Sequence, residues 1–342
     1  MNQSEEKGKP LARRQFLRAC GTALAGGSVI AVSGNLAKKA TDKRKFAFGA
    51  LTPERDGNTF VAPYRLVASF ETGGAVHCFD VADDKFFAAL PDRIAVFDAA
   101  GARLAEFAAA RETRDIAVAS DGVYLLHPAG FDAVSRDGAP LRSAEACSPD
   151  SDYCSFALTD THVFVTDAAN KHICKYTRNG VFVKFIDSPN RFIIPSYTFG
   201  IEAANGMIYC SNSGRHSIER FSEEGDYLGS FGKAGGAEGT FAGCCNPVHV
   251  TGTPWGDIIT SEKGVARISC YGGDGTFRGT LLASRELGRG AKAFDVKTEG
   301  DKLHVAGEGR ISTFKYDKQA AALAAAAAAS CGNCAVNCPL RA

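Results

Sequence analysis

Three cysteines close to the C-terminus have the spacing of metal ligands. Cys331, Cys334 and Cys338 form the pattern C-x2-C-x3-C, and Pro339 follows the last of them. Thiolates at these separations can face a single point from one loop, and iron and zinc both accept such soft ligands. The sequence therefore predicts a metal centre that takes three of its ligands from this tail.

The spacing of the tail equals that of the last three ligands in the bacterial ferredoxin run C-x2-C-x2-C-x3-C-P. The first ligand of that run would fall where this chain has Ala328. A [4Fe-4S] cluster normally takes four ligands, so we expect a fourth sulfur from elsewhere in the chain. Cys244 and Cys245 are the best donors, because this adjacent pair stands just before a short strand of the repeat described below.

Other candidate ligands stand at similar places in the sequence. Cys78 and Cys154 adjoin short strands of the same kind, and Cys147 lies on the loop that leads to Cys154. This convergence favours either one cluster capped by the tail or two metal sites near a common axis. His249 follows the cysteine pair closely and is a further candidate, as a ligand or as a hydrogen-bond partner of a ligand.

The remaining cysteines and histidines of the repeat region are expected to be structural. A cysteine within a strand usually packs in the core as a small apolar residue. We assign this role to Cys174, Cys210 and Cys270, and we also expect structural roles for His162, His172, His216 and His304.

The cysteines also have an alternative state, because an oxidising compartment favours disulfides. The chain has 12 cysteines in all, and loss of Cys20 with a leader peptide would leave an odd number. Disulfides alone would then leave one thiol over. An iron-sulfur cluster, most simply [4Fe-4S], is the favoured cofactor, and zinc or no metal at all are the alternatives.

A short pattern repeats through the middle of the chain and predicts the elements that position these residues. Its form is Ile or Phe, then an aromatic residue or Val three positions later, then Gly four positions after that. Each copy has two strand-like segments before it and one after the glycine, which makes a four-stranded antiparallel unit. The copies begin at Ile94, Phe131, Ile173, Ile218 and Ile268, with a sixth at Ile311 that lacks the glycine.

Such a unit has two apolar faces and is not stable alone, so the units must stack. Six of them stacked radially give an all-β, six-bladed propeller, whose closure protects the strand edges. We expect residues 46–48 to pair with the last unit and close the ring. A β-sandwich or a two-domain arrangement is the less specific alternative, because neither predicts one motif six times.

Several segments resemble the NHL repeats of six-bladed propellers, an architecture also seen in TolB-like proteins. They are residues 208–221, 241–249 and 260–268, and the second contains Gly243-Cys244-Cys245-Asn246-Pro247. A subset of exported NHL-repeat proteins carries this Gly-Cys-Cys-Asn-Pro element. The resemblance implies the fold, over roughly residues 66–316, and a site at the cysteine pair, but it does not name a reaction.

The N-terminal segment resembles a twin-arginine export signal. Arg13 and Arg14 precede Phe16-Leu17 and Arg18, and a weakly apolar stretch follows. The resemblance implies the export machinery as a partner, a periplasmic location and a mature chain without a membrane span. The twin-arginine route exports folded proteins, often with a cofactor already inserted.

The chain thus divides into four predicted parts. An alanine-rich stretch after the repeats has high helix propensity and no strongly apolar face, so we expect it to be a helical spacer. About twelve helical residues would reach ~18 Å, about the radius of a propeller. The parts are a signal peptide at 1–40, the propeller at 41–318, the spacer at 319–330 and a cysteine-rich, metal-binding tail at 331–342.

Composition and charge limit the function. The formal net charge is +1, which argues against nucleic acid as a partner, and 45% of the residues are hydrophobic, which argues for a folded chain. No hydrolase or phosphate-binding motif is present, so the sequence does not identify an enzyme. The leading hypothesis is a periplasmic iron-sulfur propeller that transfers electrons to a redox partner protein or membrane complex. The alternative is a disulfide-stapled scaffold that binds a protein, peptide or glycan at its channel.

Overall fold

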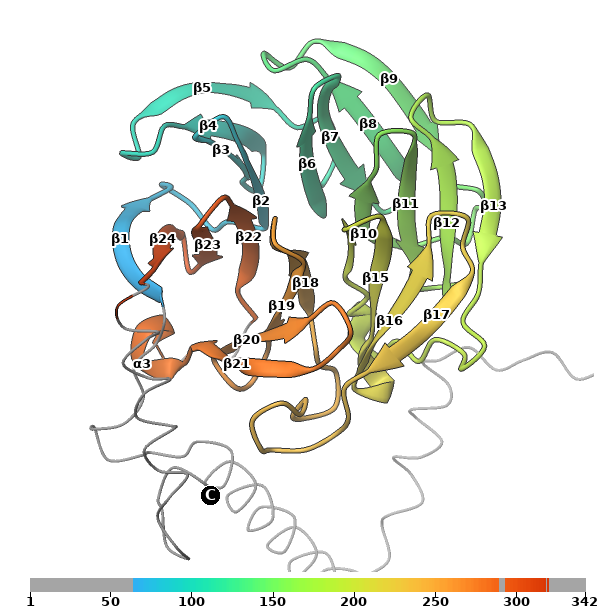
Figure 1. Ribbon diagram of the computed structural model, residues 1–342. Coiled ribbons are helices and arrows are strands. Elements are labelled where there is room, and N and C mark those ends of the chain that lie inside the picture. Colours follow the sequence, from blue (N-terminus) through green and yellow to red (C-terminus); the bar gives the residue numbers. More distant parts are fainter. Residues whose placement is uncertain (1–63, 289–292, 318, 320–342) are drawn as a thin grey trace, which may run out of the picture. The chain divides into compact units, whose positions relative to one another are not determined.

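The computed structural model describes residues 64–288 and 293–317 together with Gln319. In this part of the chain, the strands form six sheets of four strands each (Figure 1). The innermost strand of each sheet contacts the innermost strand of the next, and the last returns to the first. The predicted six-bladed β-propeller is therefore confirmed. No helix in the described ranges is long and apolar enough to cross a bilayer.

The blades are numbered here in chain order, and each is given from its innermost strand outward. Blade 1 contains β2 (Cys78–Ala82), β3 (Lys85–Ala89), β4 (Arg93–Phe97) and β5 (Arg103–Ala108). Blade 2 contains β6 (Asp115–Ala119), β7 (Gly122–His127), β8 (Gly130–Val134) and β9 (Pro140–Glu145). Blade 3 contains β10 (Tyr153–Leu158), β11 (His162–Asp167), β12 (His172–Thr177) and β13 (Phe182–Ile186).

The other three blades follow the same order. Blade 4 contains β14 (Ile201–Ala204), β15 (Met207–Asn212), β16 (Ser217–Ser222) and β17 (Tyr227–Phe231). Blade 5 contains β18 (His249–Gly252), β19 (Asp257–Glu262), β20 (Arg267–Gly272) and β21 (Phe277–Leu282). Blade 6 contains β22 (Asp295–Glu299), β23 (Lys302–Gly307), β24 (Arg310–Tyr316) and β1 (Tyr64–Glu71). Short helical turns are η1 (Pro195–Tyr197), η2 (Ser213–Arg215) and α3 (Ser284–Leu287).

Blade 6 is built from two distant parts of the chain. Its outermost strand, β1, comes from the N-terminal side and pairs antiparallel with β24, from Tyr64 opposite Tyr316 to Glu71 opposite Arg310. An N-terminal strand was expected to close the ring in this way. The segment predicted for that role, residues 46–48, lies outside the described residues, and β1 holds the position.

The repeated glycine marks the point where neighbouring blades approach each other most closely. Gly101, in the turn between β4 and β5, has a φ of 86°, and a Cβ there would lie 2.3 Å from Phe70 Cβ. Gly275, between β20 and β21, has a φ of 91°, and its Cβ would lie 2.3 Å from Phe231 Cβ. In both cases the phenylalanine belongs to the outermost strand of the preceding blade. Only glycine combines this backbone conformation with this lack of volume.

The apolar core lies between the blades. Tyr124 and Phe131 of blade 2, for example, pack with Val163 and Tyr176 of blade 3, and all four side chains are buried. Burial of side chains of this size contributes about 1.5 to 3 kcal/mol each. The sheets therefore stabilise one another, as the two apolar faces of the repeat predict.

Around the central channel, carboxylates of three innermost strands bridge to the next blade. Each accepts a hydrogen bond from a backbone N–H of the neighbouring innermost strand. The pairs are Asp295 Oδ2 with Phe79 N at 3.0 Å, Asp80 Oδ2 with Val118 N at 2.7 Å and Asp115 Oδ2 with Phe156 N at 3.1 Å. These bonds fix the relative positions of blades 6, 1, 2 and 3.

The same channel contains a strong concentration of charge. Burial raises the pKa of Asp80 and Asp115, although the Lys297 ammonium opposes the rise. Burial also raises the pKa of Glu202 from 4.5 to about 8. The attraction of these carboxylates outweighs burial at Lys297 and raises its pKa above the ordinary value. The single ammonium of Lys297 thus interacts with several acidic groups at once.

Besides residues 46–48, three segments with a sequence prediction are not described. They are the export signal at 1–40, the spacer at 319–330 beyond its first residue, and the tail at 331–342. What the sequence predicts for these segments therefore stays a prediction.

The raised pKa of Glu202 leads to a prediction about how the free energy of unfolding depends on pH. Folding raises the pKa of Glu202, so the folded state favours the protonated carboxyl group. The resulting stability is fully present below the ordinary pKa of 4.5 and is lost as the pH rises through the folded-state pKa of about 8. Glu202→Gln removes the titration. We therefore expect the free energy of unfolding of wild type, relative to Glu202→Gln, to fall between about pH 5 and about pH 9. Urea denaturation at a series of pH values measures it, and a constant difference would contradict this assignment.

Candidate metal centres

Cys244 and Cys245 lie in the loop between β17 and β18, with their sulfurs 3.0 Å apart. Cys245 is buried and Cys244 is exposed. Asn246 holds the loop in place: its Nδ2 donates to Ala242 O at 2.7 Å and to Lys263 O at 2.9 Å, and its Oδ1 accepts from Lys263 N at 2.9 Å. The Gly-Cys-Cys-Asn-Pro element therefore presents two neighbouring sulfurs on a well-braced loop.

The surroundings of the pair favour a thiolate at Cys245. Burial alone would raise the pKa of this thiol, but Cys244, Ser196 and the Lys263 ammonium together outweigh burial and lower it. The neighbouring Cys245 raises the pKa of Cys244. The Cys245 sulfur lies 3.7 Å from Ser196 Oγ, and Lys263 Nζ donates to Thr198 Oγ1 at 3.3 Å. One of the two sulfurs is thus prepared to act as a metal ligand or nucleophile.

Cys154 lines an open cavity on the side of η1. The cavity has a volume of about 490 Å³, and Arg114, Asp152 and Tyr197 line it with Cys154. Tyr197 directly follows Ser196, the residue next to the Cys245 sulfur, so η1 connects this cavity with the loop of the cysteine pair. Burial raises the pKa of Cys154 to about 12, so this sulfur is a protonated thiol in the absence of a metal.

The other two candidate ligands are Cys78 and His249, which begin two innermost strands. Cys78 opens β2 and is buried, and burial raises its pKa well above the ordinary value. His249 opens β18, and its Nδ1 lies 3.5 Å from Asp295 Oδ1. Neither residue joins the cysteine pair in a group of three metal-binding side chains within the described ranges.

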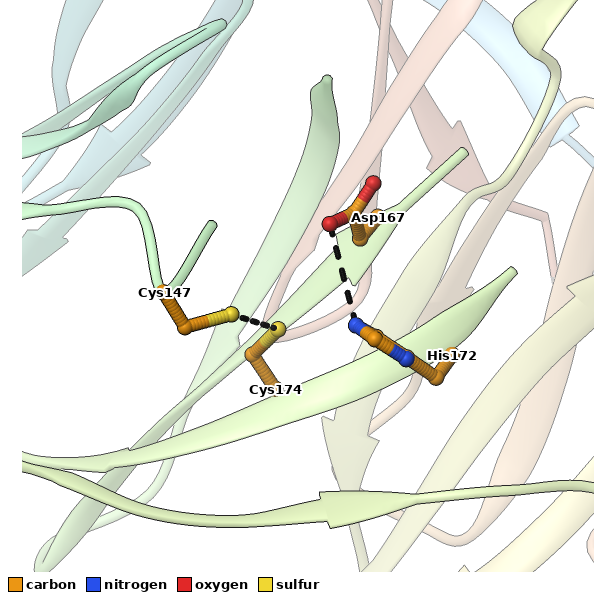
Figure 2. A group of neighbouring side chains, drawn as sticks. All are labelled: Cys147, Asp167, His172 and Cys174. Carbon is orange, nitrogen blue, oxygen red and sulfur yellow. Dashed lines mark hydrogen bonds and ion pairs between the residues drawn. The ribbon is translucent and has the colours of Figure 1, made fainter. Parts of the chain in front are cut away.

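A different group of four side chains is brought together between blades 2 and 3. Cys147, Asp167, His172 and Cys174 each offer one ligand atom, and these atoms all lie within 4.8 Å of one another (Figure 2). The Cys147 and Cys174 sulfurs are 3.2 Å apart, and His172 Nε2 is 3.7 Å from Asp167 Oδ2. The arrangement is that of a small metal-binding pocket.

Three segments of the chain supply this group. Cys147 lies in the loop that leaves β9, Asp167 ends β11, and β12 begins with His172 and contains Cys174. Asp167 and His172 are opposite each other in the β11–β12 hairpin. Burial would raise the pKa of Asp167, but hydrogen bonds from Asn170 and other donors outweigh burial and lower it. Asp167 is therefore a carboxylate, and burial lowers the pKa of His172, which favours its neutral ring.

Only one member of this group was singled out by the sequence. Cys147 was among the candidate ligands, whereas Cys174 was assigned to the core and His172 to a structural role. Cys174 is indeed fully buried, but its sulfur faces Cys147, so core packing does not describe it completely. The spacing Asp-x4-His-x-Cys across a predicted hairpin was the signal that would have found the group. Cys210 and Cys270 lie in apolar clusters, as expected.

The three tail cysteines, Cys331, Cys334 and Cys338, lie outside the described residues. Their role as ligands stays a prediction, as does the choice between Cys244 and Cys245 as the fourth.

No family model matches the sequence, and no curated protein matches it either. Solved structures with a similar fold include a virginiamycin B lyase from Staphylococcus aureus, with 12% identity and a TM-score of 0.53 over 74% of this chain and 99% of the other. A protein of unknown function from Bacteroides thetaiotaomicron has 12% identity and a TM-score of 0.57, over 74% of this chain and 72% of that one. A streptogramin B lyase has 15% identity and a TM-score of 0.50, over 74% of this chain and 96% of its own. At these identities the similarity shows the propeller fold alone.

The electrostatics of the cysteine pair make a prediction about its reactivity. Lys263→Met removes the cation that favours the Cys245 thiolate, so alkylation of the reduced 244–245 peptide should need a higher pH than in wild type. Mass spectrometry after iodoacetamide pulses over a pH series measures the profile. The control is Lys233→Met, which alters an exposed lysine of the loop that carries the cysteine pair. Equal profiles for wild type and Lys263→Met would show that the lysine does not act on the pair.

Proposed function

We propose that this chain is a periplasmic, metal-binding propeller that acts in electron transfer. An iron-sulfur cluster, most simply [4Fe-4S], is bound by Cys331, Cys334 and Cys338 of the tail and by Cys245 or Cys244 of the propeller. The twin-arginine machinery exports the folded chain, and a redox partner protein or membrane complex exchanges electrons with it.

The observation that carries this proposal is the cysteine pair itself. The tail supplies three ligands at ferredoxin spacing and lacks the fourth. The propeller offers two sulfurs 3.0 Å apart on a braced loop, one exposed and the other with a lowered pKa. A thiolate ligand needs to lose its proton, and the Lys263 ammonium assists this loss at Cys245.

The surroundings of the pair also suit a redox role. A positive charge beside a cluster stabilises its reduced, more negative state, and solvent exposure tunes its potential further. Ile193 near η1 and Tyr197 within it expose 46% and 60% of their surface, which gives a partner protein apolar area to contact. Ser196 and Tyr197 have φ values of 57° and 55°, an uncommon conformation for residues other than glycine, which is often found at functional sites.

Anaerobic purification of the full chain tests the proposal. We expect brown protein with about four iron and four sulfide per chain. Cys334→Ser and Cys245→Ser should lose iron and sulfide together, whereas Cys270→Ser, a change in the core, should retain both. If Cys244 is the ligand instead, Cys245→Ser keeps the cluster and Cys244→Ser loses it. A colourless wild type that does not take up iron and sulfide on reconstitution would refute the cluster.

A second function follows from the same sulfurs. The Cys244 and Cys245 sulfurs are 3.0 Å apart, but a disulfide between adjacent residues would be strained. The Cys147 and Cys174 sulfurs are 3.2 Å apart, so a small shift would allow a disulfide between them. In that case the chain is a stapled scaffold that recognises a protein, peptide or glycan over its channel. Mass spectrometry of unreduced protein from the periplasm, with free thiols blocked first, distinguishes the two: intact disulfides at these pairs and no iron favour the scaffold.

A further inference from the structure

The turn between the second and third strands of a blade, called the corner here together with the two residues that flank it, carries different side chains in three successive blades. The two facing positions are Asp167 and His172 in blade 3, Asn212 and Ser217 in blade 4, and Glu262 and Arg267 in blade 5. Two residues beyond the second position, the chain has Cys174, Glu219 and Ser269 respectively. The three corners therefore have the same place and the same length in their blades and differ in their side chains.

In blades 4 and 5 the corner side chains bind each other. Asn212 Nδ2 donates to Glu219 Oε1 at 2.8 Å. Arg267 donates to both oxygens of Glu262, with Nε 2.6 Å from Oε1 and Nη2 2.8 Å from Oε2. Each of these corners thus has a direct contact between its own side chains, although Glu219 Oε2 in blade 4 is buried without a hydrogen-bond partner among the described residues.

In blade 3 the two facing residues, Asp167 and His172, form no hydrogen bond with each other. His172 Nε2 is buried and has no hydrogen-bond partner among the described residues, although it faces Asp167 Oδ2 at 3.7 Å. Cys174 takes the position of Glu219, and Cys147 from the preceding blade adds a second sulfur 3.2 Å from it. Four donor atoms thus converge where the other blades place a hydrogen bond or an ion pair.

The surroundings hold these donors in position. Asp167 Oδ1 accepts hydrogen bonds from the backbone N–H groups of Asp152, Ala169 and Asn170, each at 3.1 Å. Oδ2 accepts one from Asn170 Nδ2 at 2.9 Å, which orients the carboxylate and leaves a second lone pair of Oδ2 for the group. Tyr153 accepts from Cys147 N at 3.0 Å and donates to Cys147 Sγ at 3.3 Å. Hydrogen bonds of this kind orient ligands in metal sites.

We propose that Cys147 Sγ, Asp167 Oδ2, His172 Nε2 and Cys174 Sγ bind one tetrahedral zinc ion, at a site separate from the cluster of the tail. Binding releases the two thiol protons to solvent and changes no oxidation state. A tetrahedral zinc site needs ligand atoms about 3.3 to 3.8 Å apart, and the observed separations require only small adjustments. All four positions are filled by protein, which is the pattern of a structural site.

The donor set favours zinc over other metals. Calcium and magnesium take oxygen ligands, and iron-sulfur clusters are held mainly by four cysteines, whereas this site has two sulfurs, one nitrogen and one oxygen. Zinc accepts this mixture in tetrahedral geometry. The ion would join the loop that leaves blade 2 to the β11–β12 hairpin of blade 3, and so would stabilise this blade junction.

The experiment uses the full chain, expressed with zinc and purified under reducing conditions. Metal analysis should find one zinc per chain in wild type and none in Cys174→Ala or His172→Ala. Cys210→Ala, which alters an equally buried strand cysteine of blade 4, should retain the ion. A strong chelator should lower the melting temperature of wild type and of Cys210→Ala, but not that of Cys174→Ala.

Cobalt substitution covers the case in which a variant does not fold. Co²⁺ in the wild-type site should give the visible bands of a tetrahedral ion and the charge-transfer intensity of two thiolates. Octahedral bands, a fully reduced wild type without zinc, or unchanged zinc in both ligand variants would overturn the proposal, as would a Cys147–Cys174 disulfide in protein kept anaerobic. Cys334→Ser should keep its zinc, so the loss of iron and the loss of zinc report on the two sites separately.

Discussion

The structure depends on the mutual burial of blade faces around a closed ring. A blade such as blade 3 has an apolar side toward blade 2, formed by Val163 and Tyr176, and another toward blade 4, formed by Phe164 and Ile173. Each side is covered by one neighbour, so both apolar sides of every blade are buried only when the ring closes. The pairing of β1 with β24 closes it at the periphery, and the carboxylate bridges at the channel fix the innermost strands.

The closed ring of blades also explains why the candidate metal ligands lie on or beside the loops that join blades. The loops that join blades are anchored in the core by residues such as Phe199 and Phe241, and they present other residues to the neighbouring blade. Cys147 and the Cys244–Cys245 pair are both on such loops, which lead from an outermost strand to the next innermost strand. A loop of this kind meets residues of the following blade, as Cys147 meets Cys174. The rigid ring thus supplies fixed partners to residues whose own segments are irregular.

The sequence predicted the ring much better than it predicted the contacts between its loops. The copies of the motif from Ile94 to Ile311 determine six units, because glycines such as Gly101 are required wherever a turn meets the neighbouring blade. The sequence did not predict the group at Cys174, because a cysteine within a strand is compatible both with packing in the core and with a role as a metal ligand. Its partner Cys147 is 27 residues away, in another blade, so only the packing of the two blades reveals the pair.

The two sulfur sites differ in burial, and this difference argues for different roles. Cys174 and Asp167 are fully buried and Cys147 is partly buried, so an ion bound by all four side chains would exchange slowly with solvent and would have no open position for a reactant. Cys244 is exposed, and Lys263 places a positive charge beside Cys245. Electron transfer needs a centre near the surface, because its rate falls steeply with distance from the partner. The accessible pair therefore suits redox exchange, and the buried group suits the stabilisation of a blade junction.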